Sequence, residues 1–127
     1  TERPGRLFVV TQQGGKTQIQ GVPAVAATGQ NGLLDVAIAP DFAASRTIYF
    51  TFAEPGPGGS GLALARARLG ATALEDLRVV WRQEPKGSGG HPGGIIAFSP
   101  DGQYLFLTAG ERMRFTPAQD LDQALGN

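Results

Sequence analysis

Two similar segments limit the folds open to this chain more than any other feature. Ala39-Pro40-Asp41 comes before the strand-like run IYFT, and Ser99-Pro100-Asp101 comes before the run LFLT. The two prolines, Pro40 and Pro100, stand 60 positions apart. A period of that size, with several strands inside it, is too long for an array of hairpins and is typical of a four-stranded propeller blade. Two ordinary strand-turn-strand units made alike by chance are the alternative.

Glycine and proline spacing supports an all-β chain. The 127 residues include 19 glycines and 9 prolines, which fall between short apolar runs as expected for many strands joined by turns. The hydrophobic content of 41% is that of a globular protein with a real core. We therefore expect one domain over residues 1–127, a partial β-propeller of the six-bladed type. It would hold about two four-stranded blades, with the repeat near 39–52 and 99–109.

Charge and cysteine content exclude several classes of function. Eleven basic and eleven acidic residues cancel, so no basic field indicates a nucleic-acid partner. The absence of cysteine removes disulfides, thiolate metal sites and cysteine nucleophiles. No apolar run approaches the roughly 20 residues that span a bilayer. The opening Thr1–Gly5 reads as a hairpin turn, so we expect further residues before it.

Alternating β-branched and aromatic residues predict the first strands. The expected strands are Leu7–Thr11, Thr17–Gln20, Leu34–Ala39, Ile48–Phe52, Leu62–Leu69 and Arg78–Gln83. Short helical pieces are expected at Leu74–Leu77 and, after Thr116-Pro117, at Ala118–Leu125. Gly56, Gly58 and Gly61 satisfy the G-x-G-x-x-G spacing of dinucleotide sites, but a strand-like run follows them. A blade connection is favoured there, and a dinucleotide site is the minor alternative.

The only histidine, His91, lies between two pairs of glycines and before Pro92. Strands at Ile95–Phe98 and Tyr104–Thr108, joined by the turn Ser-Pro-Asp-Gly, place it at the mouth of a hairpin. A histidine there can be a plain surface imidazole with no chemical task. The flanking glycines favour a functional histidine, because they remove side-chain bulk around the ring.

Three segments together resemble the soluble quinoprotein aldose sugar dehydrogenases of the glucose/sorbosone dehydrogenase family. They are GQNGLLDVAIAPDF, GSGGHPGGIIAFSPDG and GERMRFTPAQDLDQALGN, in that order over nearly the whole chain. The resemblance implies a six-bladed β-propeller, periplasmic or secreted, that binds pyrroloquinoline quinone (PQQ) with calcium. It also implies oxidation of the C1 hydroxyl of aldoses to lactones, with an external electron acceptor.

Site residues follow from the resemblance one by one. His91 matches the general base of the family, and an imidazole suits that role because its usual pKa of about 6.5 leaves a neutral base available. Gln30 matches a glutamine beside the sugar and cofactor, where an amide can orient a hydroxyl. Glu111 and Arg112 match a G-D or G-E segment near the same pocket, and we expect them to bind substrate or cofactor.

The chain departs from the family pattern next to the histidine. The family commonly has H-F-G-G-R, whereas His91 is followed by Pro-Gly-Gly and Ile95, without the aromatic ring and the cation. No metal ligand is assigned, since Asp120 and Asp122 point to different sides of any helix. The ligands of PQQ and calcium come mostly from later blades in the family. We therefore expect most of them outside this chain, and the isolated chain to be inactive.

Two rival functions stay open at this point. One is a calcium-dependent propeller lactonase, and the other is a non-catalytic propeller fragment that acts in assembly or binding. Unpaired strand edges of an incomplete propeller, and the apolar strands Ile48–Phe52 and Leu105–Thr108, also predict self-association, as a closed trimer or a dimer, unless further blades complete the ring.

Overall fold

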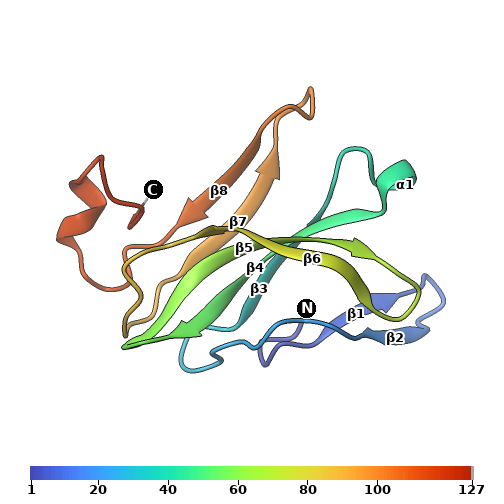
Figure 1. Ribbon diagram of the computed structural model, residues 1–127, viewed down its shortest axis with the longest axis horizontal. Coiled ribbons are helices and arrows are strands. Elements are labelled where there is room, and N and C mark those ends of the chain that lie inside the picture. Colours follow the sequence, from blue (N-terminus) through green and yellow to red (C-terminus); the bar gives the residue numbers. More distant parts are fainter. Residues whose placement is uncertain (127) are drawn as a thin grey trace.

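The computed structural model describes residues 1–126, and they form an almost entirely β structure (Figure 1). The expected all-β class is confirmed. The elements are β1 (Leu7–Val10), β2 (Lys16–Ile19), β3 (Leu33–Ile38), α1 (Phe42–Ser45), β4 (Thr47–Gly56), β5 (Gly59–Leu69), β6 (Leu74–Arg82), β7 (Gly93–Phe98), β8 (Leu105–Ala109) and the 3₁₀ helix η1 (Thr116–Gln119).

Four consecutive antiparallel strands, β3-β4-β5-β6, form the central sheet, which has the strand order of a propeller blade. Its core face pairs large with small side chains across β4 and β5: Phe50 stands opposite Ala65, and Phe52 opposite Ala63. All four are at most 1% exposed. The alternation that predicted strand Ile48–Phe52 therefore places its large apolar side chains in one packed layer.

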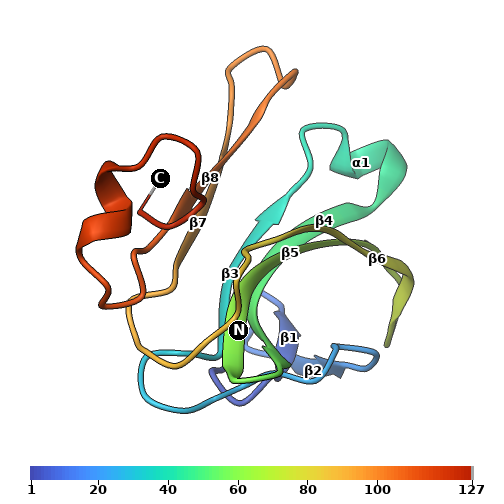
Figure 2. The same ribbon diagram turned by 60° about the vertical axis from the view of Figure 1, so that its left-hand side comes forward.

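The β1–β2 hairpin covers this core face (Figure 2). Leu7 and Ile19, which face each other across the hairpin, pack into the same hydrophobic cluster as the β4 phenylalanines. A parallel bridge between Gln20 and Ala73 ties the hairpin to the start of β6. The hairpin therefore covers one face of the four-stranded sheet as a separate two-stranded sheet and adds no strand to it.

The β7–β8 hairpin lies against the other face of the sheet (Figure 2). The Thr51 hydroxyl donates to the Gly94 carbonyl at 2.7 Å, and the Asp35 carboxylate accepts the Ile96 N–H at 2.8 Å. A register irregularity between Gly93 and Ile96 leaves that N–H free for Asp35. These contacts fix the strand that leads away from His91 against the central sheet.

The strands divide unevenly between sheets. Residues 1–126 hold eight strands, of which four form the central sheet and the others form the two hairpins. The description of the chain as about two four-stranded blades therefore stays a proposal, in which β7 and β8 begin the second blade. The two repeated turns lie side by side, since a Cβ added at Gly102 would be 3.1 Å from Pro40.

Two local predictions were wrong, and one minor alternative is excluded. The expected helical turn Leu74–Leu77 belongs to β6, because its leucines pack on the core. Within residues 114–126 only Thr116–Gln119 is helical, as a 3₁₀ helix. Leu121 is 98% exposed whereas Leu125 is 1% exposed, so the two leucines that an α-helix would place on one face are in different environments. The G-x-G-x-x-G stretch forms the β4–β5 hairpin, which excludes the helix that a dinucleotide site needs.

Candidate functional site

His91 is presented at the surface by the loop between β6 and β7. Its backbone has φ of 48°, in the left-handed region, and its side chain is 59% exposed. Pro92, next in the chain, is buried and anchors the loop. The imidazole is thus accessible while the backbone beneath it is held.

Glu111 is the partner of the histidine ring. His91 Nδ1 lies 2.5 Å from Glu111 Oε2, and the Glu111 side chain is only 13% exposed. The hydrogen bond from His91 holds the pKa of Glu111 below its usual value, and the Met113 N–H adds to this effect. Glu111 is therefore an ionised acceptor beside Nδ1 at neutral pH.

A carboxylate at Nδ1 determines what the other ring nitrogen can do. The tautomer that donates Nδ1–H to Glu111 leaves the lone pair on Nε2 of His91 free. Nε2 can then accept a proton from a hydroxyl that docks at the exposed ring edge. The pair has the chemistry of an oriented general base.

The side chain of Gln30 supports the backbone of His91. Gln30 Oε1 accepts the His91 N–H at 2.5 Å. A Cβ at Gly90 would lie 2.5 Å from the same oxygen, so glycine is needed there for this contact. The structure thus brings Gln30, His91 and Glu111 together; contact of Gln30 with a sugar stays a prediction.

Arg112, next to Glu111, is buried and faces the loop that carries the histidine. It is 4% exposed, and its guanidinium donates to carbonyls of Gly89 and Gly90. Burial lowers the pKa of the guanidinium, and the charge of Arg114 adds to this effect. A direct contact of Arg112 with substrate or cofactor stays a prediction.

Close backbone packing explains the glycines better than cleared space does. A Cβ at Gly93 would lie 2.6 Å from the Gly110 nitrogen, and one at Gly89 would collide with the Arg112 carbonyl. A Cβ at Gly110 would collide with the carbonyl group of His91. The glycines near the histidine therefore allow two loops to approach each other closely. This differs from the sequence-based expectation, in which the glycines make room for a ligand.

Two supporting residues were missed from the sequence. Gln83 is 1% exposed, accepts the Leu62 N–H and donates to the Gly110 carbonyl at 3.2 Å. Asn31 is 5% exposed and donates to the Gly89 carbonyl at 3.1 Å. A polar residue at a strand end carries no sign of burial, so only the position of Asn31 after Gln30 could have indicated it.

An ion-pair network holds the start of the histidine loop. Glu54 accepts from Lys86 at 2.6 Å and from Arg82 at 2.9 Å, and Glu54 and Lys86 are both mostly buried. Burial raises the pKa of Glu54, but hydrogen bonds from Arg82 and Lys86 outweigh it, and the pKa lies below its ordinary value of 4.5. The network fastens residues 82–86 to β4.

Replacing Glu54 by glutamine is expected to lower the free energy of unfolding at pH 7 by about 1–2 kcal/mol, because it leaves Lys86 without its anion. The pKa of Glu54 is lower in the folded state, so its stabilisation is present above pH 4.5 and is lost as pH falls through the folded value. Urea unfolding at pH 7 and at steps below pH 4.5 should show the difference shrinking. Glu75→Gln, in an exposed pair with Arg68, is the matched control; a loss independent of pH would contradict the prediction.

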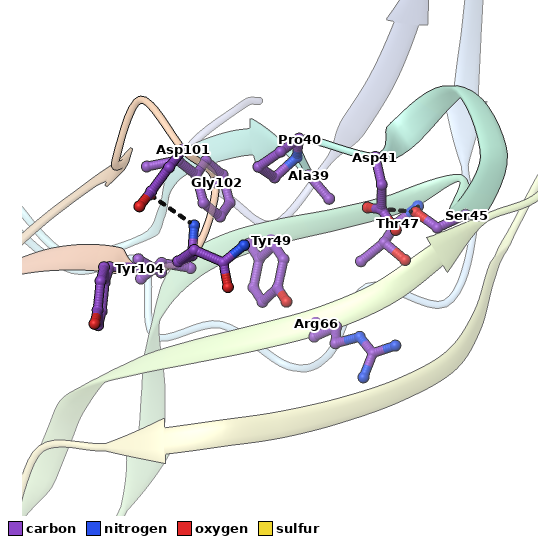
Figure 3. A pocket seen from close by; sticks show the side chains of 13 residues that line it. Ala39, Pro40, Asp41, Ser45, Thr47, Tyr49, Arg66, Asp101, Gly102 and Tyr104 are labelled. Carbon is purple, nitrogen blue, oxygen red and sulfur yellow. Dashed lines mark hydrogen bonds between the residues drawn. The ribbon is translucent and has the colours of Figure 1, made fainter.

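A sizeable cavity lies away from the histidine. It has a volume of about 550 Å³ and opens between the turn 99–102 and the residues around Pro40, at the far end of β7 from His91 (Figure 3). Tyr49 and Arg66 face it from the central sheet.

Within residues 1–126 no group of three or more His, Cys, Asp or Glu residues could hold a metal ion. The described helices include none that is long and apolar enough to cross a membrane.

The central sheet has the form of a propeller blade, and beside it an exposed imidazole is paired with a carboxylate, an arrangement that is chemically able to accept a proton from a hydroxyl. The whole chain, residues 1–127, matches the Glucose / Sorbosone dehydrogenase family. The chain belongs to that family, as its resemblance predicted.

Relatives of known name agree with the family. The chain is 46% identical over 112 residues to aldose sugar dehydrogenase YliI of Escherichia coli (strain K12), covering 85% of this chain and 30% of the relative. A crystal structure of a glucose dehydrogenase superposes with a TM-score of 0.93 at 50% identity, covering 99% of this chain and 38% of that chain. The PQQ-bound aldose sugar dehydrogenase of Streptomyces coelicolor has a TM-score of 0.85 at 28% identity, with the same coverage. The chain thus spans about a third of the length of these relatives, and its β-propeller fold is confirmed.

Proposed function

We propose that this chain supplies the proton-accepting part of a PQQ-dependent sugar dehydrogenase that oxidises the C1 hydroxyl of aldoses to lactones. The observation that carries the proposal is the exposed His91 ring with Nδ1 2.5 Å from Glu111, within a chain that matches the dehydrogenase family from end to end. The family relatives named as aldose and glucose dehydrogenases support the oxidoreductase class. A periplasmic or secreted location belongs to the same proposal.

The chain's own residues perform the proton transfer. Glu111 keeps the imidazole proton on Nδ1, and His91 Nε2 accepts the proton of the C1 hydroxyl as the C1 hydrogen leaves with its electron pair. Gln30 holds the His91 N–H, so the ring keeps its position while its charge changes. PQQ, when bound, supplies the acceptor for the hydride, and an external acceptor then takes the electrons.

The residues present fit the substrate side better than the cofactor side. PQQ carries carboxylates and needs cations or N–H donors, but the guanidinium of Arg112 already donates to the chain's own carbonyls. Calcium sites usually include several carboxylates, and residues 1–126 contain no group of three or more His, Cys, Asp or Glu side chains that could hold a metal ion. His91, with Gln30 beside it, can line the sugar end of a PQQ site. The groups that hold the cofactor and calcium are proposed to come from other parts of the propeller.

Dye reduction tests the proposed activity. The suitable sample is the extended protein, defined as a chain of the relatives' length that contains these 127 residues. We expect reduction of a dye that requires both PQQ and an aldose. Metal-dependent lactone hydrolysis without dye reduction would indicate the lactonase instead, and the absence of both activities would indicate a role in assembly or binding.

The 127 residues alone are expected neither to bind PQQ tightly nor to oxidise glucose, because the buried Arg112 is already engaged by the chain's own carbonyls and most cofactor ligands are proposed to lie in other parts of the propeller. A titration followed by PQQ absorbance measures binding directly. Binding in the micromolar range or tighter, together with sugar turnover, would contradict this assignment of the cofactor ligands.

Self-association of the 127-residue chain is a second expectation. Ile95, Tyr104 and Phe106 of the β7–β8 hairpin are each at least 60% exposed, and β8 pairs only with β7 among the described strands. The strand Ile48–Phe52 does not contribute, since β1–β2 covers its phenylalanines. Light scattering after gel filtration should show a dimer or trimer. A monodisperse monomer at all concentrations, with no chain-to-chain contact near the usual 800 Å² or so per partner, would exclude it.

A further inference from the structure

The guanidinium of Arg112 joins the pieces of chain that carry the proposed base. Nε donates to the Gly90 carbonyl at 3.1 Å, and Nη2 donates to the Gly89 carbonyl at 2.9 Å. Nη1 donates to the Ser60 carbonyl at 3.0 Å, and Nη2 also reaches the Ser60 hydroxyl at 3.3 Å. All three nitrogens thus contact protein acceptors.

These acceptors lie in two places that meet around the histidine. Gly89 and Gly90 immediately precede His91, and Ser60 lies near the start of β5, where it is bridged to Gly87. Arg112 itself follows Glu111 in the chain. One planar group therefore connects the loop that carries the imidazole, the segment that carries its carboxylate partner and the rigid central sheet.

The charge of Arg112 makes a purely space-filling role costly. The side chain is 4% exposed, and no carboxylate among residues 1–126 forms an ion pair with it. A buried cation without an anion is usually less favourable than an apolar side chain of the same size. The planar, multiply donating guanidinium is instead suited to fixing several carbonyls in one geometry.

We propose that Arg112 is a positioning residue that sets the His91 ring against Glu111 and so keeps Nε2 free to accept a proton. This role rests on the proposed function, and it differs from the direct substrate or cofactor contact expected from the sequence. Arginine is required because its donors span both Ser60 and the two glycine carbonyls. A lysine has one nitrogen and cannot reach the two places at once.

Nitrogen NMR of the imidazole tests the proposal on the 127-residue chain without PQQ or sugar. His91 is the only histidine, so its ¹⁵N signals are unambiguous. At a pH where the ring is neutral, we expect the Nδ1–H tautomer in the parent. In Glu111→Gln, where the carboxylate is gone, the Nε2–H tautomer should be the major form. Arg112→Lys should give the tautomer ratio of Glu111→Gln, although Glu111 is still present.

Arg114→Lys is the matched control, since Arg114 lies two residues away, is half-buried, and has only backbone hydrogen bonds within residues 1–126. It should keep the parent tautomer. Unchanged amide signals of β4 and β5 verify that Arg112→Lys is folded. If it does not fold, Ser60→Ala, which removes only the hydroxyl acceptor, should shift the tautomer ratio part of the way.

The outcomes separate this proposal from the proposed function. An Nδ1–H tautomer that persists in Arg112→Lys, or in a folded Ser60→Ala when Arg112→Lys is unfolded, overturns the role of Arg112 whatever the enzyme does. In the extended protein, Arg112→Lys should lower kcat for the aldose with little change in KM, as expected when a base is misplaced. A tautomer shift with no dehydrogenase activity in the parent would leave the positioning role intact and contradict only the proposed function.

Discussion

Replacing His91 by alanine in the extended protein is expected to lower kcat for aldose oxidation by about 10²-fold or more, as loss of a general base does. The reason is the geometry of the ring, which is exposed and oriented by Glu111 at 2.5 Å. PQQ affinity should change far less, because His91 is proposed to act on the sugar hydroxyl. Steady-state dye reduction and a PQQ titration on the same samples measure the two effects separately.

Gln18→Ala is the control for the His91 substitution. Gln18 is exposed on β2, which lies at the other end of the structure from the histidine loop (Figure 1). It should keep the parent kcat. A near-normal kcat in His91→Ala would remove His91 from the role of base and leave it as a surface imidazole.

Gly110→Ala is expected to have the largest effect of any single methyl group on both stability and activity. Gly110 donates its N–H to the Pro92 carbonyl at 2.9 Å, and an added Cβ would lie 2.8 Å from the His91 carbonyl carbon and closer still to its oxygen. Both neighbours are backbone, so no flexible side chain can move aside. We expect a loss of unfolding free energy on the order of 3 kcal/mol. The loops on either side of the His91–Glu111 pair must also separate, and a displacement near 1 Å lowers kcat by about 10²-fold.

Gly58→Ala isolates the part of this effect that comes from contact. Gly58 has φ of 78° and no atom near its added Cβ, so alanine there adds backbone strain without a collision. It should cost about 1 kcal/mol and leave kcat unchanged. Urea unfolding and dye reduction of both variants decide the matter, and equal effects of the two substitutions would contradict the close approach of Gly110 to His91.

The sequence predicted the parts of the fold that depend on local pattern. Alternation over Ile48–Phe52 and the turn Ser-Pro-Asp-Gly after Phe98 gave the strand β4 and the β7–β8 hairpin, because period-two burial and turn chemistry are readable residue by residue. The start of β6 was missed, since Leu74 and Leu77 take strand conformation only through pairing with β5 and packing on the core. The helix expected at Ala118–Leu125 failed for the same reason, as tertiary contacts decide whether a short helix forms.

The site was predictable only in its principal residues. His91 and Glu111 came from the resemblance, and the structure brings them together; their catalytic roles stay proposals. The buried state of Arg112 could not be foreseen, because an arginine in a polar loop normally faces water. Gln83 gave no signal at all, since its contacts depend on how Gly110 folds back over the histidine loop.

The fate of the sugar's first carbon tests the proposed function most directly. Glucose labelled with ¹³C at C1 is incubated with the extended protein, PQQ, calcium and an electron acceptor, and the products are followed by ¹³C NMR. We expect the C1 signal to move to that of a lactone carbonyl, and then of the hydrolysed acid, only when PQQ is present. An unchanged C1 signal, or oxidation at another carbon, would contradict the assignment of this chain to an aldose C1 dehydrogenase.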